Sequence, residues 1–541
     1  MCTKLLIVEF IKMDITKKQF PIGIQNFAEL RQGNYYYVDK TPKIIELINT
    51  SKYIFLSRPR RFGKSLTIDT IAQLFAGNKE LFTGLYAEQQ WQWDTQYPVL
   101  RISFGGGASS ENNKVGDVIS DTLQFLEEKW EITNVKATHS GRLKTIIEHC
   151  HQVTGNKVVI LVDEYDKPIL DNLSDSVKAI SIRNELRDFY GVIKDSDAHI
   201  HFAMLTGVSK FSKINLFSGL NNLYDVTLDE RFSALCGYTQ TELESVFAPE
   251  LEQVDLEELK KWYNGYNWTG EAVYNPFDVL LFLNNPQKLY KNYWIETGNA
   301  TFLMDKLLNE NTHIHQLIGR LIDNQRLSQF EIGDISIIAL LFQTGYLTID
   351  KMLLKPSIRY TLKFPNIEVQ QSLSESLLIK YISHAKDDML LKQSQLYEAI
   401  LQHDLGSIES IIKAFFSSIP HNWHRNNTIA NYEGYWASVF YALFASLGFQ
   451  TITEDATSLG NIDMTLIVDN HVYIFEFKVV GGENEQPQGI ALSQIKNKQY
   501  ADKYKLPERI IHQIGIEFNK NSHTVVFDRA GGRNLRGFTV N

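Results

Sequence analysis

Short apolar runs alternate with amphipathic segments through the first half of the chain, and this alternation predicts a fold. Four runs have the length and β-branched content of buried strands, at residues 52–57, 98–104, 157–164 and 200–208. The segment LTIDTIAQLFAG, which follows Ser65, repeats its apolar positions at helical spacing. Strands and helices in alternation predict an α/β domain with a parallel sheet.

From Gly237 to about residue 400 the pattern becomes mostly helical. Thr239 followed by Glu242 has the spacing of a capping box, which predicts a helix start. The aromatic-rich segment KKWYNGYNWTGEAVYNPFDVLLFL and the later LLFQTGYLTI predict a helical lid followed by a small winged-helix-like unit. We interpret these aromatic residues as core and assign the region to coupling, not to chemistry.

Beyond residue 400 a buried helix and a β-hairpin can be recognised. The segment NYEGYWASVFYALFASLGF predicts a helix with one apolar stripe. The stripe consists of Tyr432, Trp436, Val439, Phe440, Leu443, Phe444 and Leu447. In NIDMTLIVDNHVYIFEFK, two β-rich runs flank Asp469-Asn470, a pair suited to a two-residue hairpin turn.

Length and composition indicate several soluble domains. A chain of 541 residues is too long for one hydrophobic core. Its 44% hydrophobic and 22% charged content, without a run of transmembrane length, is that of an ordinary soluble globular protein and indicates neither a membrane span nor a disordered tail. Cys2, Cys150 and Cys236 are odd in number and far apart, which fits a reducing compartment and predicts a cytoplasmic protein.

The boundaries between these patterns predict four parts. They are an N-terminal extension (1–20), an α/β domain (21–236), a helical lid and winged-helix-like region (237–400) and a second α/β domain (401–541). A second start is available at Met13, so residues 1–12 are either native or an upstream extension.

The net charge restricts where a polyanion could bind. A formal net charge of −9 excludes a surface that is basic throughout, so a nucleic acid would need a local patch. From residue 496 onward basic residues outnumber acidic ones. The basic residues are Lys496, Lys498, Lys503, Lys505, Arg509, Lys520, Arg529, Arg533 and Arg536. A solvated charged face explains the same composition equally well.

Residues 58–65, RPRRFGKS, lie between the first predicted strand and its helix and are close to the P-loop pattern. In a P-loop the helix N-terminus holds phosphates, the lysine reaches the β and γ oxygens of ATP, and the hydroxyl holds Mg²⁺. Lys64 and Ser65 fit these roles, whereas Arg58 replaces the first glycine of the pattern, which leaves a basic turn as the alternative. The candidate nucleotide-binding residues are Arg58, Arg60, Arg61, Phe62, Gly63, Lys64, Ser65 and Leu66.

The strand KVVILVDE ends in two carboxylates, and these supply the acidic functions of phosphoryl transfer. Asp163 is the candidate Mg²⁺ ligand and Glu164 the candidate that polarises the attacking water. Thr206 and Ser209, after the next strand, occupy the place of a γ-phosphate sensor, although a structural turn explains them as well. Ligands of parallel sheets bind at the carboxyl ends of strands, where Lys64, Asp163 and Thr206 are expected.

An arginine that contacts the γ-phosphate cannot be chosen from the sequence. Three candidates are Arg183, Arg187 and Arg231. P-loop ATPases that take such an arginine from a neighbouring subunit assemble, so a homo-oligomer is an open alternative.

The hairpin predicts a second site. If Val468 pairs with His471, the antiparallel register places Asp463 directly opposite Glu476, and the alternation of side chains puts Lys478 on the same face. Opposed carboxylates destabilise a hairpin unless a divalent cation offsets their charge, so Asp463 and Glu476 are candidate metal ligands. Lys478 would position the water or add positive charge. A surface hairpin with an ion pair is the alternative, and a one-residue slip would separate the two acids.

Two further residues come from helices. Glu433 borders the apolar stripe of the helix before the hairpin. Gln494 and Lys498 share one face of the predicted helix IALSQIKNKQYADKY, which could flank the site and contact a nucleic acid backbone.

The spaced acid followed by Glu476-Phe-Lys478 resembles the PD-(D/E)XK nuclease superfamily, with Glu433 and Gln494 matching the helix-borne residues of many members. The whole chain resembles a bacterial family with an N-terminal AAA-ATPase-like domain and a C-terminal nuclease domain of that superfamily. The resemblance lies in PIGIQNF, YYVDKT, RPRRFGKS, LVDEYDKP, TGVSKFS, YNGYNW, QTGYLTI and FPNIEV. In that family an arginine at position 58 is usual.

The resemblance implies an AAA-like P-loop ATPase domain at 21–236 and a restriction-endonuclease-like domain at 401–541. Our leading hypothesis is an enzyme in which ATP controls Mg²⁺-dependent cleavage of nucleic acid, with DNA favoured over RNA and no membrane partner. The alternatives are a nucleotide-driven switch or scaffold whose nuclease-like domain only binds, and a plain ATPase with a structural C-terminal domain.

Overall fold

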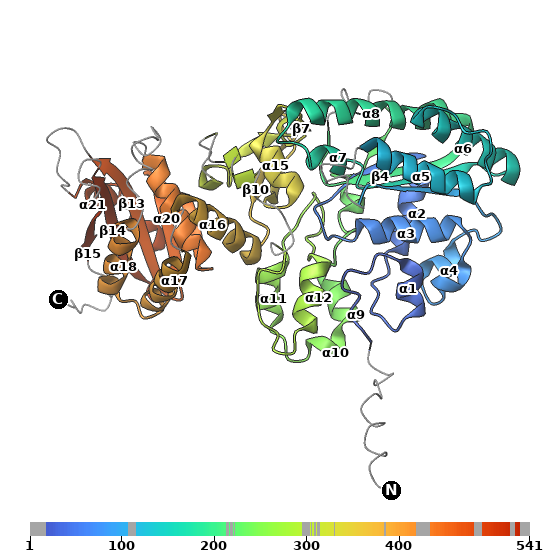
Figure 1. Cartoon of the computed structure of the whole chain (residues 1–541). Coiled ribbons are helices and arrows are strands. Elements are labelled where there is room, and N and C mark those ends of the chain that lie inside the picture. The colour runs from blue at the N-terminus through green and yellow to red at the C-terminus, as the bar shows by residue number, and fades with distance from the viewer. Residues whose placement is uncertain are drawn as a thin grey trace, which may run out of the picture. The chain divides into compact units, whose positions relative to one another are not determined.

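The computed structural model describes residues 18–105, 115–211, 216, 220, 222–294, 303–304, 306–307, 310, 314–328, 330–382, 386–417, 433–480, 489–519 and 525–530. The chain divides into two compact units, and Figure 1 follows their elements in chain order. The first unit contains residues 1–294 and 321–366, and the second contains 295–320 and 367–541. The predicted division into four parts stays a prediction. Among the described residues, no helix combines the length and the apolar character needed to cross a membrane.

A five-stranded parallel sheet forms the centre of the first unit. Its order is β2 (Val99–Ser103), β3 (Val158–Asp163), β4 (Ile200–Gly207), β1 (Tyr53–Ser57) and β5 (Tyr224–Asp225). The four strands predicted from apolar runs are confirmed, and every residue of β1 and β3 is buried. The two-residue strand β5 is too short to leave a pattern in the sequence. β4 lies between β1 and β3. The carboxyl end of β1, which leads into the P-loop segment, is therefore separated by one strand from the carboxyl end of β3, which bears the acidic pair.

Helices cover both faces of this sheet. The chain runs from β1 to the far edge strand β2 and then returns through β3 to β4, so right-handed crossovers place α3 on one face and α5, α6 and α8 on the other, as Figure 1 shows. The helices of this part of the chain are α1 (Phe27–Gln32), α2 (Thr41–Thr50), α3 (Lys64–Phe75), α4 (Tyr86–Gln90), α5 (Val115–Lys129), α6 (His139–Thr154), α7 (Lys167–Leu170) and α8 (Ser176–Asp195), with 3₁₀ turns at Lys79–Phe82 and Asp197–His199.

The rest of the first unit is helical, followed by a small sheet. The predicted capping box is confirmed, since the Glu242 N–H donates to Thr239 Oγ1 (3.2 Å) and the Thr239 N–H donates to the Glu242 carboxylate (2.8 Å). Tyr263, Tyr274 and Phe282 belong to the buried core, as expected for the aromatic-rich segment. The helices are η3 (Glu230–Phe232), α9 (Gln240–Val246), α10 (Ala248–Leu251), α11 (Leu256–Tyr263), α12 (Pro276–Asn284), α14 (Asn324–Leu327) and α15 (Ile337–Thr344). The strands β6 (Leu321–Asp323), β10 (Arg359–Lys363) and β9 (Thr348–Leu353) form one sheet, and β7 (Phe330–Glu331) pairs with β8 (Asp334–Ile335).

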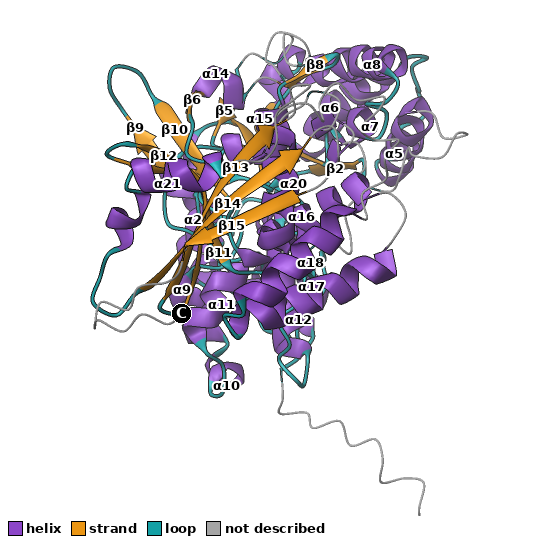
Figure 2. Cartoon of the chain, turned by 90° about the vertical axis from the view of Figure 1, so that its left-hand side faces the viewer, coloured by secondary structure: helices purple, strands orange, loops and turns teal. Residues whose placement is uncertain are grey.

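The second unit is a five-stranded mixed sheet between helices. The sheet order is β11 (Gln450–Thr457), β12 (Gly460–Val468), β13 (His471–Val480), β14 (Ile510–Asn519) and β15 (Val525–Ala530), and only β13 and β14 are parallel. Figure 2 shows the helices on either side of this sheet. The helical segments of this unit are η5 (Ile314–Gln316), α16 (Ile367–Ile382), α17 (Lys386–Leu401), α18 (Leu405–Ser417), α20 (Glu433–Ser446), α21 (Ile490–Asn497) and η7 (Tyr500–Tyr504). The helix predicted over IALSQIKNKQYADKY therefore ends at Asn497 and continues as a 3₁₀ turn.

Candidate functional sites

The loop between β1 and α3 folds around the Lys64 ammonium group. Arg61 and Gly63 have positive φ angles of 70° and 88°, which turn the chain sharply into the twelve-residue helix α3. Lys64 Nζ donates to the carbonyl oxygens of Arg58 (3.0 Å) and Pro59 (2.9 Å), and burial lowers the pKa of this ammonium although Asp163 opposes the shift. Ser65 follows in the first turn of the helix. A cation at a helix N-terminus, enclosed by a tight loop, is an arrangement that holds phosphate.

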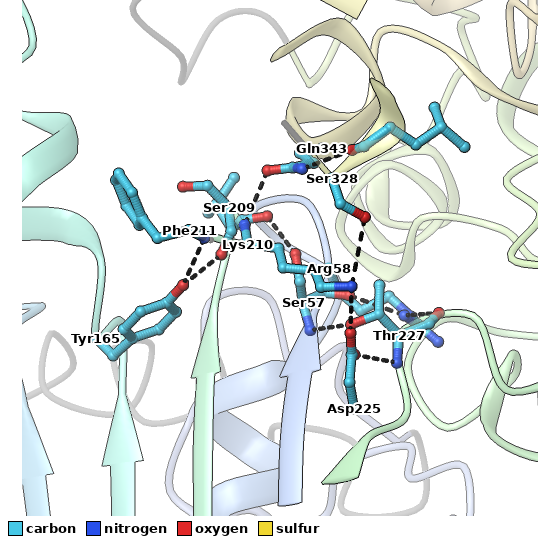
Figure 3. A network of polar contacts seen from close by, with 12 residues as sticks. Ser57, Arg58, Tyr165, Ser209, Lys210, Phe211, Asp225, Thr227, Ser328 and Gln343 are labelled. Carbon is cyan, nitrogen blue, oxygen red and sulfur yellow. Dashed lines mark hydrogen bonds and ion pairs between the residues drawn. The ribbon is translucent and has the colours of Figure 1, made fainter. Parts of the chain in front are cut away.

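Arg58 does not point its side chain into this loop. Its guanidinium is buried and donates to the carbonyl oxygens of Ser57 (2.8 Å), Thr227 (2.9 Å) and Phe232 (3.0 Å), and it lies 4.2 Å from the ring of Trp268. Burial lowers the pKa of Arg58 to about 10. The side chain therefore fastens the loop to the segments after β5, as Figure 3 shows for Thr227, and a direct role in nucleotide binding is left to the backbone of Arg58.

The remaining loop residues divide into exposed and buried ones. Arg60 and Arg61 are exposed, with the Arg61 guanidinium 4.2 Å from the ring of Phe277. Phe62 is buried and makes edge contacts with Tyr266 (4.7 Å between centroids) and Trp268 (5.3 Å). The YNGYNW segment thus packs against Phe62 of the loop between β1 and α3. The sequence does not reveal this contact. Leu66 is half-buried in the first turn of α3.

The acidic pair lies at the ends of β3 and β4. Thr206 Oγ1 donates to Asp163 Oδ1 (2.8 Å), so the sensor candidate and the Mg²⁺ candidate are in direct contact. Glu164 follows with a φ of 52°, an uncommon conformation for a residue with a side chain. Burial, and then the charge of Asp163, raises the pKa of the Glu164 carboxyl. The structure therefore brings Lys64, Asp163, Glu164 and Thr206 together at one edge of the sheet, as predicted.

Ser209 faces a different carboxylate, which sequence reasoning did not single out. Asp166 is buried and accepts from the N–H of Val208 (3.0 Å), the N–H of Ser209 (2.6 Å) and the Ser209 hydroxyl (2.6 Å). Burial raises the pKa of Asp166, while the bonds from Ser209 lower it. The signal that could have found Asp166 is a third acid, three residues after Asp163, in the segment LVDEYDKP.

The loop that follows Thr206 is connected to helix α15 by the network in Figure 3. Tyr165 Oη donates to the Ser209 carbonyl (2.8 Å), and Lys210 Nζ lies 2.6 Å from Asp225. The Lys210 N–H donates to Gln343 Oε1 (2.8 Å), and Gln343 Nε2 donates to the Leu327 carbonyl (2.9 Å). Gln343 therefore links this loop to α15 and to the Leu327 carbonyl.

The three candidate arginines contact their own sequence neighbours. Arg183 donates to Asn184 (3.0 Å) and Arg187 to Asp188 (3.2 Å), both on α8. Arg231 pairs with Asp229 at 2.7 Å. The choice among the three stays open.

The predicted register of the C-terminal hairpin is confirmed. β12 and β13 pair from Val468–His471 to Met464–Phe475, which is the predicted register, and the same register continued by one residue puts Asp463 opposite Glu476. The Phe477 N–H donates to Asp463 Oδ2 at 2.7 Å, which holds the aspartate against β13.

Glu476 is completely buried and has one unsatisfied oxygen. Its Oε1 accepts from Gln494 Nε2 and lies 3.6 Å from Lys478 Nζ, whereas its buried Oε2 has no hydrogen-bond partner among the described residues. Burial and the charge of Asp463 raise the pKa of Glu476 to about 8, against the lowering effect of Lys478. The structure therefore brings Asp463, Glu476, Lys478 and Gln494 together.

This arrangement fits a hard divalent cation. A buried carboxylate with a free oxygen next to a second carboxylate binds such a cation more readily than it remains charged alone. Within the described part of the chain no group of three or more His, Cys, Asp or Glu side chains could hold a metal. Among the described side chains the candidate ligands are therefore Asp463 and Glu476, and Mg²⁺ commonly completes its coordination with water and substrate oxygens.

Helix α21 is positioned over this site by residues that sequence reasoning missed. The buried Glu517 on β14 accepts from the Ala491 N–H (3.0 Å) in the first turn of α21. At Gly515 a side chain would collide with the backbone of Leu492, so glycine permits the close approach. Tyr500 is buried after α21, and burial and the charge of Glu476 raise its pKa. The sequence signal for this contact is Glu517 itself, an acidic residue within the apolar strand β14, which pairs with the strand of Glu476 and Lys478.

Helix α20 packs on the other face of the sheet. Phe440 lies 4.9 Å from Phe477 and Phe444 lies 5.2 Å from Phe475, measured between ring centroids, so Phe475 and Phe477 point away from the acids as predicted. Glu433 begins α20, and its side chain lies outside the described residues, as do Tyr432 and the side chain of Trp436. The other stripe residues are buried or nearly so. They are Val439, Phe440, Leu443, Phe444 and Leu447.

The basic residues near the C-terminus are partly neutralised. Lys503 pairs with Asp455 and Lys505 pairs with Asp502. Lys520, Arg533 and Arg536 lie outside the described residues. Of the predicted patch, Lys496 and Lys498 are exposed on and directly after α21.

Two segments of the chain match known families, and each contains one of the sites. Residues 21–217 match the family described as Predicted AAA-ATPase, and residues 431–528 match the PD-(D/E)XK nuclease superfamily. An "Uncharacterized protein in vnfD 5'region" from Azotobacter chroococcum mcd 1 is similar, with 51% identity over 514 residues. That match covers 95% of this chain and 98% of the relative.

Proposed function

Since this chain belongs to the family of predicted AAA-ATPase-like proteins with a C-terminal domain of the PD-(D/E)XK nuclease superfamily, we propose that it is an ATP-dependent nuclease. In this proposal the first unit binds and hydrolyses ATP, and the second unit cleaves phosphodiester bonds of nucleic acid with Mg²⁺. DNA is the favoured substrate, and the cytoplasm is the expected location.

The P-loop residues have separate tasks in this proposal. Lys64 exchanges its two loop carbonyls for the β and γ phosphate oxygens of ATP. Asp163 and Ser65 would hold the accompanying Mg²⁺, with the Thr206 hydroxyl fixing the direction of the Asp163 carboxylate. Because its pKa is raised, Glu164 is a stronger base than an ordinary glutamate and would polarise the attacking water.

The residues of the second site would hold a phosphodiester and a cation. Asp463 and Glu476 are the cation ligands, and the cation when bound supplies an activated water and stabilises negative charge on the phosphate. Lys478 adds a second positive charge on the same face of the sheet. Gln494 donates to one oxygen of Glu476, which would leave the other oxygen for a cation.

The observation that carries the nuclease proposal is the state of Glu476. Its Oε2 is buried without a hydrogen-bond partner, and its pKa is raised by burial and by the opposing Asp463. A structural hairpin would avoid this arrangement because an unsatisfied buried carboxylate costs about 1–3 kcal/mol or more. A bound cation removes that cost.

A nucleotide-driven switch is the second candidate function. The contact between Lys210 and Gln343 connects the loop after Thr206 to α15, which lies outside both family matches. A nucleotide-driven switch requires a connection between the nucleotide site and a distant element, whether or not the second unit cleaves nucleic acid.

The test combines both activities in purified full-length protein. Labelled single- and double-stranded DNA and RNA are incubated with Mg²⁺, with and without ATP, and ATP hydrolysis is followed in parallel. Lys478→Ala should abolish cleavage and leave ATP hydrolysis intact. Lys64→Ala should abolish ATP hydrolysis and change the rate of cleavage.

Control variants change exposed lysines that belong to neither site. Lys413→Ala, on the second unit, and Lys79→Ala, on the first, should leave both activities unchanged. If ATP is hydrolysed but every nucleic acid survives, the nuclease proposal fails and the switch becomes the better explanation. Cleavage that persists in Lys478→Ala would point to a contaminating nuclease.

A further inference from the structure

The hairpin formed by β9 and β10 in the first unit carries an exposed surface that neither matched segment includes. Residues 350–359 are all exposed, and Figure 2 shows the two strands and their connecting loop. The base of the hairpin is firmly held, because Ile349, Tyr360 and Leu362 are buried. The outer half therefore projects from a fixed support.

Positive charge is concentrated on this outer half. Within the described chain, Lys351, Lys355 and Arg359 form no ion pair, whereas Asp350, the one acid of the hairpin, lies 3.3 Å from Lys363. Asp323 lies opposite Arg359 in the backbone register of β6 and β10. Its carboxylate accepts from the Arg326 N–H (2.8 Å) and caps α14, and it forms no ion pair with Arg359. The hairpin thus presents three cations on a chain whose formal net charge is −9.

The register places two of these cations on one face. Arg359 pairs with Leu353, and Lys351 lies two residues before Leu353 on the same strand, so Lys351 and Arg359 project to the same side. Lys355 lies in the loop between the strands. Several cations on one hairpin can neutralise several phosphates of a nucleic acid backbone.

The same half of the hairpin exposes large apolar side chains. Met352 is 41% exposed, Leu353 45%, Leu354 64% and Ile358 48%. Proteins avoid such residues on free β-strands unless a partner covers them. Cations together with Leu, Ile, Met and Pro wedges are the composition with which proteins bind the minor groove of a duplex.

The neighbouring helix cannot serve as a groove-reading element. Residues 337–343 of α15 are all buried, so this helix supports the hairpin and does not enter a groove. Of these two elements, the hairpin is therefore the one that exposes side chains to a partner.

We propose that the β9–β10 hairpin is a binding surface for double-stranded nucleic acid, with Lys351, Lys355 and Arg359 on the phosphates and the apolar tip at the minor groove. The choice of partner rests on the proposed function, since a nuclease acts on such a polymer. The acidic remainder of the chain explains why binding depends on this local surface.

The test measures duplex binding in the full-length Lys478→Ala protein, in which the substrate is not consumed. Fluorescence anisotropy of a labelled DNA duplex is followed over a range of salt concentrations, with and without Lys351→Ala, Lys355→Ala and Arg359→Ala together. Affinity should fall by at least about tenfold, and the log–log salt dependence should become shallower by roughly 2–3, about 0.9 for each cation removed. A control with Lys136, Lys178 and Lys260 changed to Ala, all exposed on the same unit, should alter neither quantity.

A second variant separates the apolar contact from the charge. Leu354→Ser with Ile358→Ser should lower duplex affinity while the salt dependence stays constant, because no cation is lost. Thermal unfolding of each variant checks that the first unit remains folded.

Several results would overturn the proposal. One is an unchanged duplex affinity in the triple variant. Another is that the triple variant loses as much affinity for a single-stranded oligonucleotide as for the duplex. A third is that it loses affinity only for anionic lipid vesicles. The proposed nuclease activity is assayed separately with Lys478 intact. If the protein binds duplex through the hairpin but never cleaves it, the proposed nuclease activity is wrong and the proposed duplex binding by the hairpin still holds.

Discussion

Arg58 occupies the position where the P-loop pattern has a glycine, and its contacts predict what the reverse change would do. Arg58→Gly should lower the stability of the first unit by about 2–4 kcal/mol, because three charged hydrogen bonds and the contact with Trp268 are lost. Arg58→Lys should restore little, since an ammonium lacks the planar fork. Thermal unfolding and ATP affinity are the measurements.

The control for Arg58 is the exposed Arg60 in the same loop. Arg60→Ala should leave the unfolding temperature unchanged. A glycine variant as stable as the parent would show that the buried guanidinium does not anchor the loop.

Glu476 should make cation binding depend on pH. Its pKa is raised to about 8 by burial and Asp463, so below that pH a cation must displace a proton. Affinity for Mg²⁺ should fall about tenfold per pH unit below about 8 and be constant above it. Calorimetric titration at several pH values measures this.

Two variants accompany this titration. Glu476→Gln should remove cation binding, and Glu508→Gln, an exposed acid of the same unit, should not. An affinity independent of pH between about 6 and 8 would refute the role assigned to Glu476.

At the scale of elements, helix α21 depends on one buried carboxylate. Glu517→Ala removes the acceptor of the Ala491 N–H, so hydrogen exchange of residues 490–497 should rise and cleavage should slow as Gln494 loses its position. The local cost is about 1–2 kcal/mol. Glu517→Gln keeps a side-chain oxygen and should retain more protection. Unchanged exchange in both variants would contradict this account.

Three histidines connect the loop after α17 to strands β13 and β14. His471 Nδ1 lies 2.9 Å from His512 Nε2, and the His403 ring stacks on His471 with 3.3 Å between centroids. Burial, and then the charges of His471 and His403, lowers the pKa of His512 to about 4.

This cluster predicts a pH dependence of stability. Between about 6.5 and about 4 the unfolded chain binds a proton at His512 and the folded chain does not, so the His512 contribution is present above this window and is lost as pH falls. His512→Gln should therefore flatten the unfolding free energy of the second unit across that window relative to the parent. His149→Gln, in the first unit, is the control. Parallel curves for parent and His512→Gln would rule out the effect.

For the whole molecule, the two units should respond to different ligands. ATP at about one hundred times its dissociation constant should stabilise the first unit by about 2.7 kcal/mol, and Mg²⁺ should stabilise the second. Differential scanning calorimetry should show Lys64→Ala removing the first shift and Glu476→Gln the second. If ATP without Mg²⁺ moved both transitions equally, the two units would not be thermodynamically separate.

Local patterns predicted those parts of the sites whose residues lie close in sequence. Asp463 and Glu476 were placed opposite each other because one short turn determines the register of both strands. Asp166 and Glu517 were missed because their partners are distant, 43 residues away at Ser209 and 26 residues away at Ala491. No periodicity relates such pairs.

The sequence by itself therefore determined the strand and helix types, the P-loop, the acidic pair and the hairpin, since each depends on spacing along a few adjacent turns or strands. Only the tertiary structure decided that the Arg58 side chain turns away from Lys64 and bonds to Thr227, that Lys210 contacts Gln343 across 133 residues, and that Glu517 holds α21. These contacts depend on how distant elements pack, where burial and hydrogen-bond satisfaction select the partners.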